Sequence, residues 1–153
     1  MSVIRIRQGV LAQLQEEVLP LIAAQWREVA HFQDEIPLDV LWERYLESER
    51  LGLYFVLIAR RGDELVGYSS FYFIERPDHY ASSPLAASDV IYVEPALRKA
   101  GLGTGLIAAT ERLAKQKGAK WITWHVKPEL DFGPFLTERL GYILHEKSYA
   151  KVL

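Results

Sequence analysis

Residues 93–105 contain a strand end, a basic turn and three glycines that open a helix. The run reads Val93-Glu94-Pro95-Ala96-Leu97-Arg98-Lys99-Ala100-Gly101-Leu102-Gly103-Thr104-Gly105. Glycine tolerates positive φ and lets a ligand approach the main chain, and the first amide groups of a helix have no partner within it. Those amides lie at the positive end of the helix dipole, and Arg98 and Lys99 add charge beside them. The segment therefore predicts a phosphate-binding loop, with a pyrophosphate as its natural ligand.

Two other phosphate-binding motifs do not fit this spacing. A P-loop requires Gly-Lys-Ser or Gly-Lys-Thr, which does not follow these glycines. A dinucleotide-binding fingerprint requires glycines directly after the strand and an acidic residue about 20 residues later. Here residues 94–100 separate the strand from the glycines, and residues 122–125 contain no acidic side chain. A tight turn alone would explain glycines, but it would not require Arg98 and Lys99.

The composition indicates one folded domain over residues 1–153. Half of the 153 residues are hydrophobic and a quarter are charged, which is enough for one core and too little chain for two ordinary domains. The formal net charge of −2 gives no general attraction to nucleic acid or to an anionic membrane. The absence of cysteine excludes disulfides, thiolate metal sites and cysteine nucleophiles.

The apolar runs are short. Residues 1–7 interleave charged and apolar side chains, unlike a signal peptide. The longest apolar run, residues 53–59, is far shorter than the roughly 18 residues of a membrane-spanning helix. We therefore expect a cytoplasmic protein that has neither a membrane nor a nucleic acid as its partner.

Hydrophobic periodicity predicts two early helices followed by a sheet. Residues 3–7 alternate as a strand does, and apolar residues at intervals of three and four predict one long bent helix from Leu11 to Val29. Pro20 should kink or split that helix. Asp39 is placed to cap a second helix, and Gly52 to end it.

The remaining elements follow from turn residues and β-branched runs. We expect a hairpin of residues 53–60 and 65–74, a strand over residues 89–93, a helix from Gly103 to Lys117, a strand over residues 120–126, a short helix over residues 132–140 and one or two closing strands in residues 142–153. This order predicts an α+β fold with a mixed, mostly antiparallel sheet of about six to seven strands. It also predicts one βαβ crossover and helices on both faces of the sheet.

The glycine-rich segment resembles the acyl-CoA pyrophosphate loop of the GNAT N-acetyltransferase superfamily. The motif of that loop is Arg or Gln, two residues, Gly, one residue, Gly or Ala, and Arg98, Gly101 and Gly103 match it. The order of the expected elements is also similar to the superfamily, as is the run Phe135-Leu136-Thr137-Glu138-Arg139-Leu140-Gly141-Tyr142 near the end of the chain. The resemblance implies a GNAT-like acyl-CoA N-acyltransferase fold and transfer of an acetyl group from acetyl-CoA to a primary amine of a small molecule or peptide. Members of the superfamily are frequently dimeric, which allows a homodimer.

The resemblance also implies a cofactor site. In the superfamily the strand before the loop is bulged and splays from its parallel neighbour, so that the pantetheine arm bonds to its backbone. In this chain Ile91 and Val93 would contact pantetheine, and the N–H of Ile91 or Tyr92 would stabilise the oxyanion. The expected cofactor-binding residues are Ile91, Tyr92, Val93, Arg98, Lys99, Ala100, Gly101, Leu102, Gly103, Thr104 and Gly105.

Direct attack by a neutral amine, the superfamily's reaction, needs a group that accepts a proton. Asp89, Glu94 and His125 are the candidates. Strand alternation places Asp89 on one face with Ile91 and Val93 and places Glu94 on the other, unless a bulge changes that parity.

The leaving thiolate then needs a proton. The superfamily often uses a tyrosine four residues before the glycine of its final motif, and Thr137 occupies that position here. Tyr149 or Tyr142 could replace it, or water could protonate a thiolate that leaves readily. The missing tyrosine keeps open an alternative, a CoA-binding module with little or no catalysis.

Two loops are the expected acceptor-selecting segments. Residues 31–35 and 75–80 combine acidic and aromatic side chains, which favours a cationic amine. His31 and His79 are isolated and lack the spacing of metal ligands, so we expect no metal site.

Overall fold

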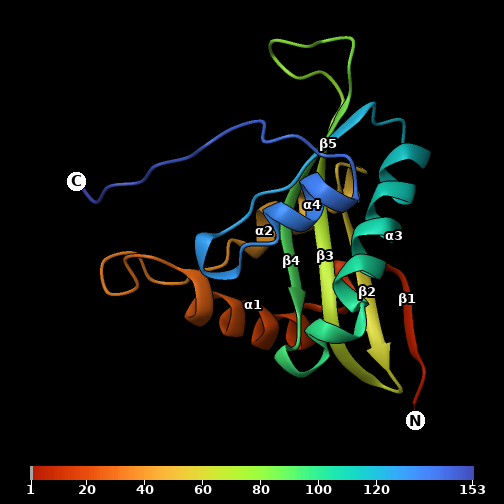
Figure 1. The fold of residues 1–153 in the computed structure, drawn as a ribbon, viewed down its shortest axis with the longest axis vertical. Coiled ribbons are helices and arrows are strands. Elements are labelled where there is room, and N and C mark those ends of the chain that lie inside the picture. The colour runs from red at the N-terminus through yellow and green to blue at the C-terminus, as the bar shows by residue number, and fades with distance from the viewer. Residues whose placement is uncertain (1) are drawn as a thin grey trace. The chain divides into compact units, whose positions relative to one another are not determined.

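The computed structural model describes residues 2–153, and its five strands form one sheet in the order β1-β2-β3-β4-β5 (Figure 1). In chain order the elements are β1 (Ile4–Gly9), the 3₁₀ helix η1 (Leu11–Gln13), α1 (Gln15–Val29), α2 (Trp42–Arg50), β2 (Tyr54–Arg61), β3 (Glu64–Ile74), β4 (Leu85–Val93), η2 (Pro95–Ala100), α3 (Leu102–Gln116), β5 (Trp121–Thr123), η3 (Pro128–Leu130) and α4 (Gly133–Arg139).

Two compact units make up the chain. The first, called here the sheet unit, comprises residues 2–22 and 40–125 and contains all five strands, α2 and α3. The second unit comprises Ala23–Asp39 and Val126–Leu153 and contains η3 and α4. Helix α1 contributes its first half to the sheet unit and its second half to the second unit. The expectation of a single domain stays a prediction.

The sheet is mixed, as expected, but smaller than expected. β1 to β4 pair antiparallel in succession, and β5 pairs parallel with β4 after the crossover through α3. The prediction of six to seven strands is therefore wrong by one or two strands. The hairpin is confirmed as β2 and β3, with Gly62 at φ +62° in its turn.

The end of the chain accounts for the missing strands. Residues 142–153 form no strand or helix, and Ile143, Leu144 and Tyr149 are 81%, 71% and 88% exposed. A strand is stabilised by hydrogen bonds to a neighbouring strand, and none of the strands described in residues 2–153 pairs with this segment. The prediction of one or two closing strands in residues 142–153 is therefore wrong. The predicted strand over residues 120–126 is also shorter, because β5 spans only Trp121–Thr123.

The predicted helix ends are partly correct. Pro20 lies inside α1 without splitting it, because it is exposed and water can satisfy the carbonyl group that loses its N–H partner. Asp39 does not cap α2, whose N-cap residue is Leu41 and has no side-chain cap. Gly52, at φ +72°, directly follows the C-cap residue of α2 and ends the helix as expected.

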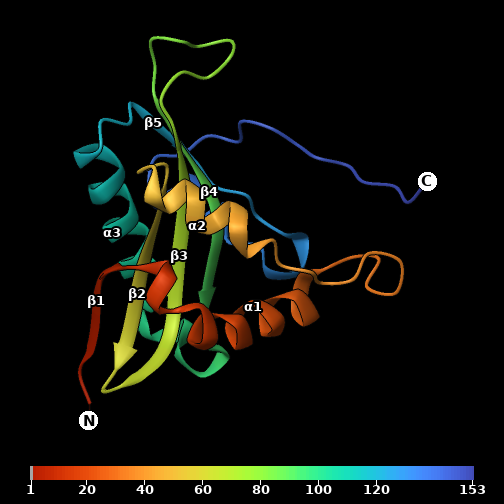
Figure 2. The ribbon, with the colours of Figure 1, turned by 180° about the vertical axis from the view of Figure 1, so that it is seen from behind.

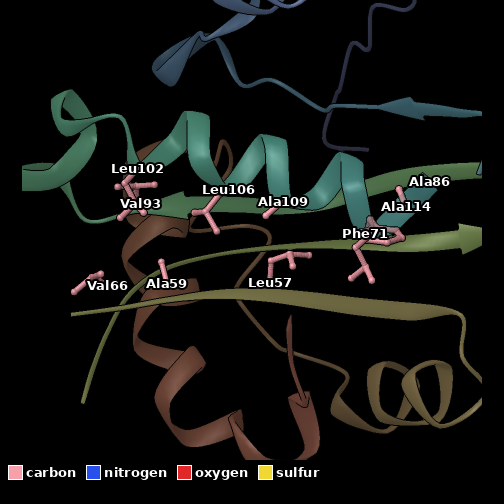
Figure 3. Close-up of a cluster of buried hydrophobic side chains, with 11 residues drawn as sticks. Leu57, Ala59, Val66, Phe71, Ala86, Val93, Leu102, Leu106, Ala109 and Ala114 are labelled. Carbon is pink, nitrogen blue, oxygen red and sulfur yellow. The ribbon is translucent and has the colours of Figure 1, made fainter. Parts of the chain in front are cut away.

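The core lies between α3 and one face of the sheet (Figure 3). Leu102, Leu106, Ala109 and Ala114 of α3 project toward side chains of β2, β3 and β4, among them Leu57 and Phe71. α2 covers the opposite face (Figure 2). There the ring of Tyr45 contacts those of Tyr54 and Tyr72. Helices therefore lie on both faces of the sheet, as predicted.

None of the helices in residues 2–153 combines the length and the hydropathy that crossing a membrane requires.

One buried polar contact fixes α3 on the sheet, and it gives a stability prediction. The hydroxyl groups of Ser69 and Thr110 are 2.6 Å apart, and Thr110 Oγ1 donates to the carbonyl oxygen of Leu106 at 2.7 Å. Both residues are fully buried. Thr110→Val should lower the free energy of unfolding by about 1–3 kcal/mol, because it leaves the Ser69 hydroxyl buried without a partner. Urea unfolding measures this difference.

Ser69→Ala is the matched control, because Thr110 keeps its bond to Leu106. We expect a smaller loss from Ser69→Ala, and a double variant that is less destabilised than the sum of the two single variants. Additive losses would contradict the assigned hydrogen bond.

Candidate functional site

The N-terminus of α3 has the geometry expected of an anion site. Gly101 adopts φ +82° as its N-cap residue, and the first turn begins at Leu102 without any acidic side chain. The amide groups at the start of this turn have no carbonyl partner within the helix and lie at the positive end of its dipole. α3 is 15 residues long, so its dipole is that of a full helix.

The three glycines of this turn have different reasons for lacking a side chain. Gly101 needs glycine because its φ of +82° strains other residues. Gly105 needs glycine because a Cβ atom would lie 2.8 Å from Cδ1 of Ile6. A Cβ atom on Gly103 would meet nothing within 4 Å. The fold of the protein therefore explains Gly101 and Gly105 but not Gly103, although glycine inside a helix costs about 1 kcal/mol relative to alanine.

Arg98 and Lys99 lie at the end of η2, directly before that turn. Arg98 Nε donates to the carbonyl oxygen of Val93 at 3.0 Å, and its guanidinium carbon lies 5.7 Å from the centre of the Tyr92 ring. Arg98 thus fastens the loop to the end of β4, a role that sequence did not predict. Lys99 is exposed and brings a second positive charge next to the first turn of α3.

β4 contains a bulge at Asp89. The register with β3 runs from Ser70 opposite Val90 to Phe71 opposite Ser88, so Asp89 is an extra residue in β4. β5 pairs with β4 only over Leu85–Ala87. Beyond the last pair, the N–H of His125 donates to Oγ of Ser88 at 3.1 Å. The bulge and the early end of the parallel ladder are the strand geometry that the resemblance implies.

The bulge changes the parity of the strand. Ile91 lies opposite Ser69 and therefore faces α3, whereas Asp89 accepts a hydrogen bond of 3.0 Å from the Tyr54 hydroxyl on the α2 face. The prediction that Asp89 shares a face with Ile91 and Val93 is therefore wrong, because the extra residue rotates the strand between them. Alternation beyond Tyr92 places Glu94 on the α2 side as well. The bulge brings the two candidate carboxylates to the same side of β4.

The other two catalytic candidates lie outside the strands. His125 is exposed and lies beyond the end of β5, not within the strand as predicted. Tyr149 belongs to the second unit and is 88% exposed. In the same unit, Thr137 lies in α4 and its hydroxyl donates to the carbonyl oxygen of Pro134 at 3.2 Å.

The expected acceptor loops have few contacts that suggest a binding site. In the second unit, His31 Nε2 forms a hydrogen bond with Glu129, and this bond lowers the pKa of the Glu129 carboxyl. Gln33 donates to backbone carbonyls, including that of Ala30. In the sheet unit, the ring of Tyr80 packs edge-on against Trp121. The part of the chain that the structure describes contains no group of three or more His, Asp or Glu side chains placed to hold a metal ion.

Sequence analysis missed a set of tyrosines beside Asp89. Tyr54, Tyr68 and Tyr72 lie on the α2 face of the sheet together with Ser70. The sequence places Tyr68, Ser70 and Tyr72 at alternate positions of one strand, and hence on one face, but the polar Ser69 between them hides this pattern.

Comparison with known proteins identifies the class of this fold. The sequence matches the model of the Acetyltransferase (GNAT) family over residues 16–142. No curated protein matches the sequence.

Solved structures with the same fold include several acetyltransferases. The aminoglycoside acetyltransferase meta-AAC0020 from an uncultured soil metagenomic sample, in complex with sisomicin, has a TM-score of 0.72 at 17% identity, over 98% of this chain and 97% of that one. The ribosomal-protein-alanine N-acetyltransferase of Brucella melitensis biovar Abortus 2308 has a TM-score of 0.72 at 21% identity, over 99% of both chains. Aminoglycoside N-acetyltransferase AAC(6')-Iy in complex with CoA has a TM-score of 0.72 at 23% identity, over 100% of this chain and 96% of that one.

The prediction that this loop binds the diphosphate of CoA can be tested at Gly103. Gly103→Ala should raise the free energy of unfolding by up to about 1 kcal/mol, because alanine is the better helix former and the site has room for a Cβ atom. The same substitution should weaken CoA binding, and Gly103→Asp should abolish it by placing a negative charge at the helix N-terminus. Urea unfolding and calorimetry measure the two effects. Unchanged affinity of both variants for CoA would contradict the assignment.

Proposed function

The chain belongs to the GNAT acetyltransferase family, and we propose that it transfers an acetyl group from acetyl-CoA to a primary amine in a ternary complex. The amine attacks directly, so no covalent intermediate with the protein is required. The protein's tasks are to bind the two substrates, to accept a proton from the amine and to return one to the leaving group.

Gly103 is the main observation that supports acetyl-CoA as the co-substrate. Its missing side chain costs helix stability and is required by no contact of the protein. A ligand that approaches the backbone at this point explains the glycine. The amides of the first turn and the charge of Lys99 would bind the diphosphate, while Arg98 holds the loop against β4. When bound, acetyl-CoA supplies an activated thioester carbonyl.

β4 beyond the bulge is the proposed site of the pantetheine arm. The parallel ladder ends at Ala87, so the arm would run along Ile91, Tyr92 and Val93. A backbone N–H of Ile91 or Tyr92 would stabilise the negative charge that develops on the carbonyl oxygen. These roles come from the resemblance, and the bulge and the short β5 support them.

Asp89 and Glu94 are the proposed proton acceptors. Both are partly exposed, and the bulge brings them to the same side of β4. A carboxylate at this position can accept the proton of the attacking amine directly or through one water molecule. His125 remains a third candidate, with its backbone N–H bonded to Ser88 at the end of the parallel ladder.

The acceptor is proposed to be a small cationic amine or a peptide amine. Similar structures include acetyltransferases for aminoglycosides and one for a ribosomal protein, at the same TM-score of 0.72. Both classes of acceptor therefore belong in the assay. We also propose that the protein acts in the cytoplasm.

An acetylation screen tests the proposed function. The protein is incubated with acetyl-CoA and polyamines, aminoglycosides, amino acids or peptides, and free thiol and acetylated product are measured. We expect thiol release that depends on the amine and matches the product formed. CoA affinity without turnover on any amine would instead identify a CoA-binding module, as Thr137 in place of the usual tyrosine allows.

Tyr149 is the proposed source of the proton for the leaving thiolate. General acids contribute about 10²-fold or more, but thiolates leave readily near neutral pH, so the effect here should be smaller. We expect Tyr149→Phe to lower kcat by about tenfold without changing the affinity for CoA, as measured by steady-state kinetics and calorimetry. An unchanged kcat would assign this role to water or Tyr142.

A further inference from the structure

Three tyrosine rings gather beside the bulge of β4. The ring centres of Tyr54 and Tyr72 are 4.8 Å apart, and the ring of Tyr45 from α2 lies 5.0 Å from Tyr54 and 6.0 Å from Tyr72. Tyr54 is buried, whereas Tyr45 and Tyr72 are partly exposed. We call Tyr45, Tyr54 and Tyr72 the tyrosine cluster. Aromatic faces in such a group attract cations.

Asp89 places a negative charge against this cluster. Its Oδ2 accepts the hydrogen bond from Tyr54 at 3.0 Å, and its side chain is partly exposed. Within residues 2–153, no Lys, Arg or His side chain forms an ion pair with Asp89. A carboxylate accepts up to about four hydrogen bonds, so the interactions with Tyr54 and Tyr45 leave capacity for a further donor. The carboxylate is thus well placed for a cation that comes from outside the chain.

Two buried hydroxyl groups on the same face of the sheet add a second, independent observation. Tyr68 and Ser70 are 2% and 0% exposed. Tyr68 Oη has no hydrogen-bond partner among the described residues, whereas the Ser70 hydroxyl interacts with that of Tyr54 and opposes the rise in the Tyr54 pKa. Burial of an unpaired hydroxyl group costs about 1–3 kcal/mol, so such groups usually have a partner. Burial raises the pKa of Tyr68, and the charge of Asp89 raises it further, which places the Tyr68 hydroxyl within the field of this carboxylate.

The tyrosines stay neutral in this setting. Burial raises the pKa of Tyr45 and Tyr54, and the negative charge of Asp89 raises both further. Their hydroxyl groups therefore keep their protons at neutral pH, and Asp89 remains the negative group that a bound cation would meet. The charge of Asp89 favours a cationic ligand at this face, although the guanidinium of Arg44 lies near enough to Tyr72 to oppose the rise in its pKa.

We infer that the tyrosine cluster and Asp89 bind the acceptor as its ammonium ion and so select protonated primary amines. The carboxylate balances the charge and accepts hydrogen bonds from the ammonium N–H groups, and the partly exposed rings of Tyr45 and Tyr72 contact the carbon atoms next to nitrogen. This inference rests on the proposed function and adds to it the residues that recognise the acceptor. It moves acceptor selection from the loops at residues 31–35 and 75–80 to the α2 face of the sheet.

Binding of a charged probe and a neutral one of similar size tests the inference. The CoA-loaded protein is titrated with n-butylammonium and, separately, with 1-butanol, and amide shifts of β3 and β4 are followed by NMR. We expect n-butylammonium to bind at least about tenfold more tightly than 1-butanol, because only the cation meets the carboxylate. Equal binding of the two probes would overturn the inference.

Variants locate the charge that is responsible. Asp89→Asn keeps an oxygen for the Tyr54 hydroxyl and should weaken n-butylammonium binding by about tenfold or more. Asp63→Asn, at an exposed turn of the hairpin, is the matched control and should have no effect. Unchanged n-butylammonium binding in Asp89→Asn would overturn the inference. Weaker n-butylammonium binding in Asp78→Asn, with binding unchanged in Asp89→Asn, would also overturn it and would place the cation site in the loop at residues 75–80.

The aromatic contribution is tested at Tyr72, which is partly exposed and can be changed with little risk to the fold. Tyr72→Leu should weaken n-butylammonium binding by about two- to fivefold, whereas Tyr72→Phe should retain it. CoA affinity, measured on every variant, reports an intact fold. If n-butylammonium binds as expected but the acetylation screen detects no turnover, the proposed function is refuted. If the protein acetylates an amine but Asp89→Asn leaves n-butylammonium binding unchanged, this inference alone is refuted.

Discussion

One extra residue in β4 determines the geometry of the site. Asp89 has no partner in β3, and a bulged strand bends and twists at the inserted residue. The parallel ladder with β5 ends two residues earlier, at Ala87. The insertion also turns the Asp89 side chain to the α2 face, where it meets Tyr54, while Ile91 still faces α3. A regular strand at this position would place the carboxylate in the core beneath α3.

Sequence patterns predicted the parts of the fold that depend on local chemistry. The hairpin, α3 and α4 follow from turn residues, β-branched runs and helix ends that lie within each segment. The strand before the glycines was predicted only over residues 89–93, whereas β4 begins at Leu85, in the part that pairs with β5. The glycine turn that opens α3 was predictable for the same reason, because glycine spacing and basic residues are local, and its phosphate-binding role stays a prediction. Gly101 and Gly52 are at positive φ where the pattern places helix ends.

The features that were predicted wrongly depend on how separate segments pair, which the residue types within one segment do not encode. Asp89 looks like an ordinary strand residue until its register against Ser70 and Phe71 is known, and the predicted parity failed for this reason. Residues 142–153 were predicted to close the sheet, but they form no strand and pair with none of the described strands. Asp39 has the chemistry of a cap, yet α2 begins only at Trp42. In each case the residue type was compatible with the predicted element, but the pairing or the boundary of the element differs in the structure.

The position of the bulge also bears on why the proposed reaction would use a ternary complex. The amides of α3 lie on one side of β4, and the tyrosine cluster lies on the other. A sheet paired along its full length would keep a thioester and an amine apart, because its backbone would separate the two faces. The ladder between β4 and β5 stops at Ala87, next to the bulge. Donor and acceptor bound on opposite faces could therefore meet at this edge, each held by its own residues, without a covalent carrier on the protein.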